Sequence, residues 1–386
     1  MKKIAILTAT RAEYGLLSPI IKKLKYISEI EVTVVVTGAH LSPEFGMTVN
    51  EIELDGITVD KKIEILLSAD TPSAISKSMG LAMIGFAEYF SECELDALLV
   101  LGDRYETLAV CFAALNAHIP IIHLHGGEAT EGLVDESIRN VITKLSYLHF
   151  TSTESYRHRV IQMGESPDRV FNVGAIGVEN AMHAELLSQT ELEAKLGCVL
   201  GEKYCVLTFH PVTLEDNTAE KQTEELLKAI EKFPDITFLC TKANADMNGR
   251  IINEYLQSYA DRHNHLYLFD SLGMKKYLSA LRHAEFVIGN SSSGLIEAPC
   301  FKIPSINIGD RQKGRIQSLS TINCPPTAPE IEASIKKALS ENFRKTLENV
   351  VNPYGDGNTS DRIVEITAEF LLQEKFKLQK RFYDII

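Results

Sequence analysis

The stretch Ala97-Leu98-Leu99-Val100-Leu101-Gly102-Asp103-Arg104 joins five apolar residues to a glycine, an acid and a base. Strands buried on both faces of a parallel sheet are apolar almost throughout, and ligand-binding residues follow their carboxyl ends. The same arrangement recurs along the chain, where short apolar runs precede segments with helical spacing. These runs are Lys3–Thr8, Val32–Thr37, Ala97–Leu101, Ile119–Leu124 and Leu148–Ser152, then Tyr204–Phe209, Ile236–Thr241, Leu266–Phe269, Phe286–Gly289 and Pro304–Gly309. We therefore expect an α/β fold with two parallel sheets in series.

Length and spacing predict two domains. A chain of 386 residues exceeds what one hydrophobic core usually fills. We expect a first domain over residues 1–175 and a second over 203–358, because a glycine-bounded helical stretch at 176–202 separates the two sets of runs. The last segment, 359–386, carries one amphipathic pattern from Ser360 to Arg381, which predicts a single long helix that packs across domains.

Composition argues against several classes of protein. Lys and Arg number 39 against 52 Asp and Glu, so the formal net charge is −13, and no nucleic-acid partner is expected. The apolar stretch in residues 1–10 is too short for a signal peptide core or a membrane span, so no membrane contact is expected. The seven cysteines lack the spacing of a disulfide framework or a zinc site, which favours the cytoplasm.

Three familiar signatures are missing from the sequence. The turn Ala9 to Gly15 lacks the glycines that a dinucleotide pyrophosphate needs for close backbone approach. No Gly-Lys precedes Ser or Thr as in a phosphate loop, and no Gly-x-Ser-x-Gly elbow is present. Neither a dinucleotide cofactor nor the common nucleotide chemistries are therefore expected.

Acidic residues follow the runs of the first half. Gly102 to Glu106 and His123 to Glu128 follow two neighbouring runs, and Asp135, Glu136 and Arg139 come soon after. Each acid alone could cap a helix, and the two histidines with an acid could belong to a metal site. Together they form a carboxylate cluster of the kind that general acid–base catalysis uses.

The second half carries groups suited to a diphosphate. His210 follows one run, and Gly289 to Gly294 follows another, ahead of a helix expected to contain Glu297. Hydroxyls and backbone N–H groups at a helix amino terminus bind anions, although a plain serine cap gives the same pattern. Gly309 to Arg315 adds three cations, and Arg11 is a candidate ligand because the helix dipole disfavours a cation where a helix begins. A nucleotide diphospho-sugar fits both halves.

On these residues the chain resembles the hydrolysing UDP-N-acetylglucosamine 2-epimerases of bacterial sialic acid synthesis. The resemblance rests on Thr10-Arg11-Ala12-Glu13-Tyr14-Gly15, Gly102 to Glu106, His123 to Glu128, Arg139 to Lys144, Phe209-His210-Pro211, Gly289 to Glu297 and Gly309 to Arg315. It implies two Rossmann-like domains that face a cleft in the glycosyltransferase-B architecture, with the last helix returning to the first domain. It also implies anti elimination of UDP to a 2-acetamidoglucal, followed by hydration to N-acetylmannosamine.

The resemblance implies roles for individual residues. The catalytic candidates are Asp103 and Asp135, then Glu128, Glu136 and His125, together with His210 and Arg139. The candidates to bind UDP-N-acetylglucosamine and the product UDP are Arg11, Arg104, His210, Ser291, Ser292, Ser293, Gly294, Glu297, Arg311 and Arg315. Some relatives carry Glu in place of His125, so an acid role is not carried over to His125. Many relatives also carry His in place of Asn140. The resemblance requires no metal ion or cofactor and implies a homodimer or homotetramer.

Three alternatives stay open at the level of the sequence. The first is a hydrolysing 2-epimerase for UDP-N,N′-diacetylbacillosamine in legionaminic acid synthesis, whose motifs look alike. The second is a retaining glycosyltransferase on the same fold, which needs an acceptor alcohol. The third is a catalytically silent UDP-sugar sensor, which would have no use for the acids of the first domain.

Overall fold

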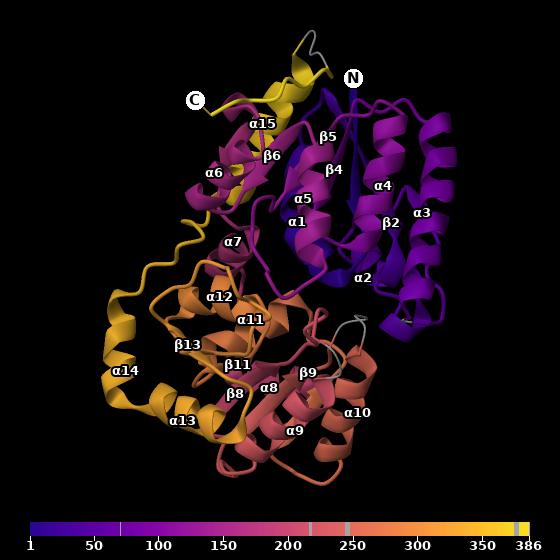
Figure 1. Ribbon diagram of the computed structural model, residues 1–386. Helices are drawn as coiled ribbons and strands as arrows, with labels where there is room; N and C mark the ends of the chain where they lie inside the picture. Colours follow the sequence, from indigo (N-terminus) through magenta and orange to yellow (C-terminus); the bar gives the residue numbers. More distant parts are fainter. Residues whose placement is uncertain (70, 216–217, 244–247, 374–377, 386) are drawn as a thin grey trace. The chain divides into compact units, whose positions relative to one another are not determined.

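The computed structural model describes residues 1–69, 71–215, 218–243, 248–373 and 378–385 (Figure 1). The chain forms two compact units. The first unit contains Met1–Glu128, Asp135–Ile176 and Gly355–Ile386, and the second contains Ala129–Val134 and Gly177–Tyr354. Each unit is built on one parallel sheet, which confirms the expected fold class. The domain bounds expected from the sequence, 1–175 and 203–358, stay a prediction.

The first unit holds a seven-stranded sheet in the order β3-β2-β1-β4-β5-β6-β7, and all neighbouring strands are parallel. Its strands are β1 (Lys2–Thr8), β2 (Ile30–Thr37), β3 (Lys61–Ile63), β4 (Ala97–Leu101), β5 (Ile121–Leu124), β6 (Leu148–Thr151) and β7 (Val170–Asn172). Its helices are α1 (Arg11–Leu24), η1 (Gly38–Leu41), η2 (Pro43–Phe45), α2 (Val49–Leu54), α3 (Pro72–Glu92), α4 (Tyr105–Asn116), α5 (Asp135–Leu145), α6 (Glu154–Gln162), η3 (Pro167–Arg169) and α15 (Thr359–Leu372).

Successive residues of β1 pack against two different helical layers. Ile4 and Ile6 belong to one core, together with residues of α1 and α15, whereas Ala5 and Leu7 belong to another, together with residues of α3 and α4. Figure 1 shows these helices on opposite sides of the sheet. A strand covered on both faces has no polar face, and this is why the run is apolar without alternation.

The second unit holds a six-stranded parallel sheet in the order β10-β9-β8-β11-β12-β13. Its strands are β8 (Tyr204–Thr208), β9 (Thr237–Thr241), β10 (Leu266–Phe269), β11 (Val287–Gly289), β12 (Ser305–Ile308) and β13 (Thr321–Cys324). Its helices are α7 (Ile176–His183), α8 (Gln189–Leu196), α9 (Ala219–Ile230), α10 (Gly249–Ala260), α11 (Gly273–His283), α12 (Ser293–Ile296), η4 (Ala298–Phe301), α13 (Ala328–Leu339), α14 (Glu341–Thr346) and η5 (Leu347–Asn349).

Three strands at the sheet edges were not predicted from the sequence. They are β3, β7 and β13, and each lies at the end of a sheet with one neighbour only. Each is short and includes an exposed residue, so none of them forms an apolar run. Edge strands need less apolar surface than central ones, and their sequence signal is correspondingly weak.

The expected connecting helix at 176–202 is two helices, so this prediction was wrong in detail. Ser188 ends the break between α7 and α8, because its hydroxyl caps the backbone N–H of Glu191 and its own N–H donates to the Glu191 carboxylate at 2.8 Å. This reciprocal capping starts a new helix. The break is also anchored by the Leu187 N–H, which donates to Ser279 Oγ of α11 at 2.9 Å.

The single helix expected from Ser360 to Arg381 was also wrong in its length. Helix α15 packs on α1 of the first unit, as expected, but it ends at Leu372. Residues 374–377 of the predicted helix lie outside the described residues, and 378–385 are not helical.

Specific contacts explain why the end of the tail is not helical. Lys380 Nζ lies 3.0 Å from the buried carboxylate of Glu165 and donates to the carbonyl of Ser146 at 2.7 Å. The Tyr383 N–H donates to the Gly164 carbonyl at 2.9 Å. These contacts to the first unit replace the internal hydrogen bonds of a helix.

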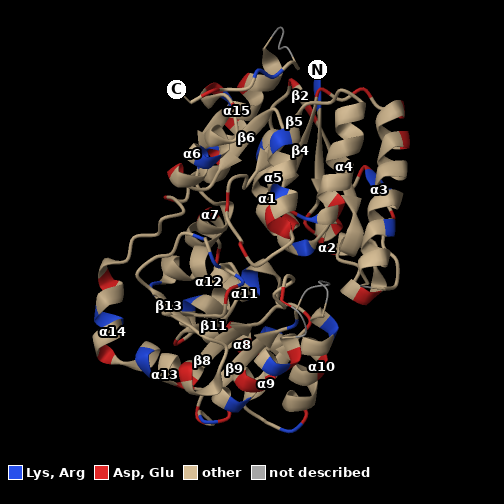
Figure 2. Cartoon of the chain, in the orientation of Figure 1, with Lys and Arg blue, Asp and Glu red and all other residues tan. Residues whose placement is uncertain are grey.

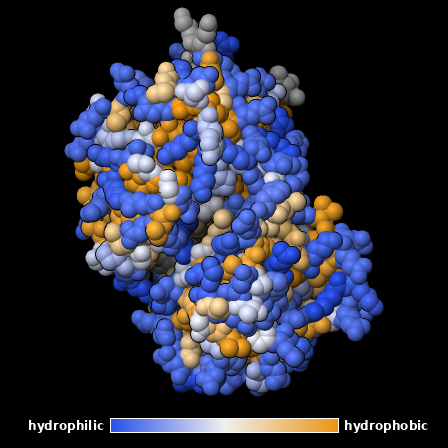
Figure 3. Space-filling model, turned by 180° about the vertical axis from the view of Figure 1, so that it is seen from behind, coloured by the Kyte–Doolittle hydropathy of each residue, from blue (hydrophilic) through white to orange (hydrophobic). Residues whose placement is uncertain are grey.

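The surface carries both charged and apolar side chains. Figure 2 shows acidic and basic residues interspersed on the helices of both units. On the face seen in Figure 3, hydrophilic side chains alternate with smaller apolar areas. Within the described residues, no helix has the length and apolar character needed to cross a membrane.

Candidate functional site

Two neighbouring strands of the first unit deliver the acidic segment to one edge of its sheet. Leu101 at the end of β4 pairs with Leu124 at the end of β5, so the residues that follow them are neighbours. Gly102 has φ +82°, a conformation that favours glycine, and it turns the chain from β4 toward Asp103. The sheet therefore brings Asp103 and the segment after β5 together, as predicted from the strand ends.

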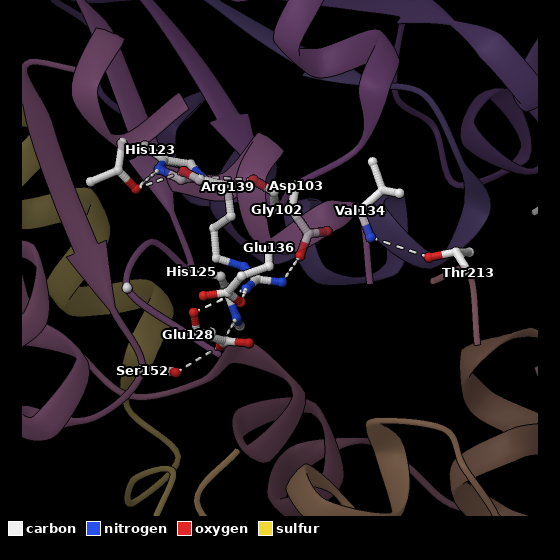
Figure 4. Close-up of polar contacts among 12 residues, drawn as sticks. Gly102, Asp103, His123, His125, Glu128, Val134, Glu136, Arg139, Ser152 and Thr213 are labelled. Atoms are coloured by element: carbon white, nitrogen blue, oxygen red, sulfur yellow. Dashed lines mark hydrogen bonds and ion pairs between the residues drawn. The ribbon is translucent and has the colours of Figure 1, made fainter. Parts of the chain in front are cut away.

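Arg139 organises the cluster shown in Figure 4. It lies on α5 and is 1% exposed. Its guanidinium pairs with the Asp103 carboxylate, donates to Glu136 Oε2 at 2.8 Å and donates to the Glu128 carbonyl at 2.9 Å. A buried guanidinium is stable only when its donors are satisfied, so Arg139 fixes these groups relative to one another. We therefore interpret Arg139 as a positioning residue.

His125 and Glu128 form a second hydrogen-bonded pair in this cluster. His125 Nδ1 lies 2.9 Å from Glu128 Oε1, and Ser152 Oγ donates to the same oxygen at 2.9 Å. An ionised carboxylate can only accept, so His125 Nδ1 is the donor toward Glu128. His125 Nε2 is buried and has no hydrogen-bond partner among the described residues. A buried polar atom of this kind often belongs to a functional site.

The neighbouring His123 has a structural role instead. Its Nε2 lies 2.7 Å from the Gly102 carbonyl, and its Nδ1 lies 3.4 Å from Thr143 Oγ1. Burial lowers the pKa of His123 to about 3, so the ring is neutral near pH 7. It holds the turn that precedes Asp103 and has no nitrogen left for a ligand.

The backbone after β5 depends on glycine. Gly127 has φ +76°, and a Cβ atom there would lie 2.5 Å from the Tyr156 carbonyl. Arg159 also donates to the Gly127 carbonyl at 2.5 Å. The tight turn carries the chain back so that Glu128 can reach His125, which itself has φ +68°. Any side chain at Gly127 would push this turn away from α6.

The other predicted residues of the first unit stand at or next to the starts of helices. Asp135 is the first residue of α5 and is half-buried. Arg104 precedes α4, and its Nε donates to the buried Glu106 carboxylate at 2.9 Å. Arg11 begins α1 and its guanidinium lies 3.7 Å from the Glu51 carboxylate. Their roles toward a ligand stay predictions.

In the second unit, Asn290 ties two predicted segments together. The His210 N–H donates to Asn290 Oδ1 at 2.7 Å, and Asn290 Nδ2 donates to the His210 carbonyl at 2.7 Å. The Asn290 carbonyl accepts from Gln312 Nε2 at 2.8 Å and from Arg311 at 3.2 Å. His210 and Arg311 are thus held at the ends of β8 and β12, on either side of β11.

The serine segment differs from the expectation in one respect. Ser291, Ser292, Ser293 and Gly294 do follow β11, but α12 has only four residues and ends at Ile296. Glu297 is therefore not inside a helix but at the junction with η4. So short a helix supplies little dipole, and any anion binding by this segment must come from hydroxyl and backbone N–H groups.

Close packing fixes the positions of this segment. A Cβ atom on Gly294 would lie 2.5 Å from Ser305 Oγ, and a Cβ atom on Gly177 would lie 2.1 Å from Glu297 Oε1. The missing side chains allow α12 to approach β12 and the Glu297 carboxylate to approach α7. Arg315, the last predicted cation, is half-buried after the glycine turn at Gly314, which has φ +87°.

Sequence reasoning missed three residues that hold the two sites. Ser152 fixes Glu128, Asn290 links His210 to Arg311, and Gln312 anchors the basic loop. Each follows an apolar run or lies beside a predicted residue, so its position could have been identified from the sequence. Its partner could not, because the partners lie up to 80 residues away in the sequence.

No group of three or more His, Cys, Asp or Glu side chains arranged to hold a metal ion is found in the described ranges. Both nitrogens of His123, His125 Nδ1 and one oxygen of Glu128 are occupied by the contacts above.

Comparison with known proteins finds similar chains and a matching family. The profile of a family described as UDP-N-acetylglucosamine 2-epimerase matches residues 22–368. A Campylobacter jejuni protein named GDP/UDP-N,N′-diacetylbacillosamine 2-epimerase (hydrolyzing) is 42% identical over 345 residues, which cover 89% of each chain. An Escherichia coli protein named polysialic acid biosynthesis protein P7 is 40% identical over 386 residues, which cover 100% of this chain and 98% of the relative.

A solved structure shows the same fold. The UDP-GlcNAc 2-epimerase of Neisseria meningitidis, bound to UDP-GlcNAc, matches with a TM-score of 0.80 at 19% identity. The match covers 96% of this chain and 100% of that one. It confirms the expected fold class of two Rossmann-like domains of the glycosyltransferase-B type.

Proposed function

Because the chain belongs to the UDP-N-acetylglucosamine 2-epimerase family, we propose that it is a hydrolysing 2-epimerase that converts UDP-N-acetylglucosamine and water to UDP and N-acetylmannosamine. The observation that carries the proposal is the cluster of Asp103, His125 and Glu128 around the buried Arg139. The relative named for polysialic acid biosynthesis, similar along the entire chain, supports a place in sialic acid synthesis and capsule formation.

The first step is the elimination of UDP. Carbon 2 of the sugar is not adjacent to a carbonyl, so its proton becomes acidic only as the bond from carbon 1 to UDP breaks. The electron pair of that bond leaves with UDP, and a base takes the proton. We assign the leaving diphosphate to the second unit, where hydroxyls, backbone N–H groups and cations can hold it. The residues are His210, Ser291, Ser292, Ser293, Gly294, Arg311 and Arg315, with Glu297 for the ribose and Arg11 and Arg104 as further ligands.

The second step adds water to the glucal double bond. One group takes a proton from water as its oxygen bonds to carbon 1, and another delivers a proton to carbon 2 from the face opposite to the one that lost its proton. We assign removal of the C2 proton to Asp103. Because the new proton must reach the opposite face of carbon 2, a different group delivers it, and we place His125 ahead of Glu128 and Glu136 for that role. Glu128 and Glu136 are already engaged by neighbouring side chains, whereas His125 Nε2 has no hydrogen-bond partner in the described part of the chain. Asp135 remains a candidate through its position at the start of α5.

A second substrate is favoured by one comparison. The Campylobacter jejuni relative is named for N,N′-diacetylbacillosamine, which differs from N-acetylglucosamine at carbons 4 and 6. The same elimination and hydration would then serve legionaminic acid synthesis. Separate incubation with each UDP-sugar decides between them, and a higher kcat/KM for the diacetylated sugar would overturn our choice of substrate.

The function is tested by proton NMR of the reaction in deuterated water, with UDP-N-acetylglucosamine as sole substrate. We expect free UDP and N-acetylmannosamine that carries deuterium at carbon 2. Recovery of UDP-N-acetylmannosamine would instead show a non-hydrolysing epimerase, and product formation only with an acceptor alcohol would show a glycosyltransferase. Binding of UDP without turnover of either sugar would show a sensor.

Arg311→Ala is expected to weaken UDP binding by roughly 10- to 100-fold, because charge-assisted hydrogen bonds to phosphate are worth about 1.5–3 kcal/mol. Isothermal titration calorimetry with UDP measures the effect. Lys313→Ala is the matched control, since Lys313 lies in the same loop, is exposed and pairs with Glu131 at 4.0 Å. Equal affinity for UDP in the Arg311 variant and the control would remove Arg311 from the site.

We also propose that the enzyme works in the cytoplasm. All seven cysteines are free, and Cys111, Cys205 and Cys240 are buried, as suits a protein that does not depend on oxidation. The homodimer or homotetramer expected from the relatives stays a prediction.

A further inference from the structure

Two buried glutamates lie at the starts of neighbouring helices in the first unit. Glu13 is on the first turn of α1, which follows β1, and Glu106 is on the first turn of α4, which follows β4. β1 and β4 are adjacent in the sheet, so both helices begin at the edge that carries Asp103. Glu13 is 7% exposed and Glu106 is 1% exposed. Carboxyl groups are seldom buried to this extent without a partner for each oxygen.

Within the described part of the chain, only one oxygen of each carboxyl group has a hydrogen-bond partner. Glu13 Oε2 accepts from the backbone N–H of Ala9 at 2.8 Å and of Thr10 at 3.3 Å. Glu106 Oε1 accepts from Arg104 Nε at 2.9 Å. Glu13 Oε1 and Glu106 Oε2 are buried and have no hydrogen-bond partner among the described residues. If both carboxylates were ionised, they would repel each other, and the charge of Arg104 would balance only one of them.

We propose that the two buried carboxyl groups of Glu13 and Glu106 hold one proton between them, and that this pair and Arg104 act as a positioning unit for Asp103, the residue before Arg104. The inference rests on the proposed function only in naming Asp103 as the group that is positioned. With one proton, the charges of Glu13, Glu106 and Arg104 sum to zero inside the protein. Without this proton, one buried negative charge is uncompensated, and this disturbs the ion pair between Arg104 and Glu106.

The surrounding charges support this assignment. Burial, and then the charge of Glu106, raise the pKa of Glu13 to about 7, while Arg104 and the two backbone N–H groups oppose the rise. From η1, His40 faces the same turn, but burial lowers its pKa to about 4, so it is neutral near pH 7. Arg11, which starts α1, is paired with Glu51.

The pH dependence follows from the sign of the shift. The pKa of Glu13 is higher in the folded chain than its ordinary value of 4.5, so the folded state binds the proton more tightly. The stabilising effect of that proton is complete below about pH 4.5 and is lost as the pH rises through about 7. The unfolding equilibrium constant of the wild type should therefore rise by roughly tenfold or more from pH 5.5 to pH 8.5 through this group.

Glu13→Gln is the test, because its amide oxygen can accept from Ala9 as the carboxyl group does, and its side chain is neutral at every pH. We expect the stability gap between wild type and Glu13→Gln, measured by urea unfolding, to shift in favour of the variant by roughly tenfold in equilibrium constant from pH 5.5 to pH 8.5. We also expect the variant to retain kcat above pH 7, where the wild type loses it with little change in KM. Glu88→Gln, on the exposed face of α3, is the control and should follow the wild type.

The outcomes separate this inference from the proposed function. If the gap between wild type and Glu13→Gln is the same at both pH values, Glu13 is ionised in the folded chain and the inference fails. If neither UDP-sugar is converted by the wild type, the proposed function fails, and the unfolding data still decide whether Glu13 carries the proton. A stability gap that changes with pH while the kcat profiles coincide would overturn the positioning role.

Discussion

Asp103→Asn should lower kcat by roughly 1000-fold or more, as is typical for loss of a general acid–base group, while UDP binds as tightly as to the wild type. The amide keeps the size of the side chain but cannot take the C2 proton. Asp103 belongs to the first unit, and the residues assigned to UDP in the proposal lie mostly in the second. Turnover of the UDP-sugar and calorimetry with UDP measure the two effects separately.

The control for this variant is Asp168→Asn, an exposed acid on η3 of the same unit. It should retain full activity. Because Asp103 pairs with the buried Arg139, Asp103→Asn also leaves part of that guanidinium uncompensated, so the unfolding free energy of each variant must be measured. Activity of Asp103→Asn within about tenfold of the wild type, with the fold intact, would contradict the assignment.

His125→Asn should lower kcat by roughly 100-fold or more, the usual effect of removing a positioned proton-transfer group. Asparagine tolerates the positive φ of this position, so the backbone turn is kept. Glu128→Gln should cause a loss of the same order, because an amide can donate to Nδ1 and so favour the wrong tautomer. Steady-state kinetics of both variants and of the double variant test whether the pair acts as one unit.

His118→Asn is the matched control for this series. His118 also has a positive φ, at +58°, and is exposed after α4. If the two single variants act through one unit, the double variant should be little worse than either, since effects within such a unit are not additive. Independent, additive losses, or a His125 variant as active as the His118 control, would remove the pair from the reaction.

Several features of the candidate site could be predicted because they depend on position along a strand. Asp103, His125 and His210 come within two residues of the end of an apolar run, and parallel strands carry such residues to one edge of a sheet. The helix break at Ser188 and the length of α12 could not be predicted in the same way. Capping bonds and packing against neighbouring strands decide where a helix stops, and local propensity does so only weakly.

The sequence by itself determined the fold class, the two sheets and the residues at their strand ends, because burial on both faces leaves a local, apolar pattern. Tertiary structure alone decided which polar atoms are satisfied. It buried Arg139 between two carboxylates, and it left Nε2 of His125 and one oxygen each of Glu13 and Glu106 without a partner in the described residues. Hydrogen bonds and buried charges depend on atoms that are distant in sequence and close in space, and their chemistry follows only when those atoms have been placed.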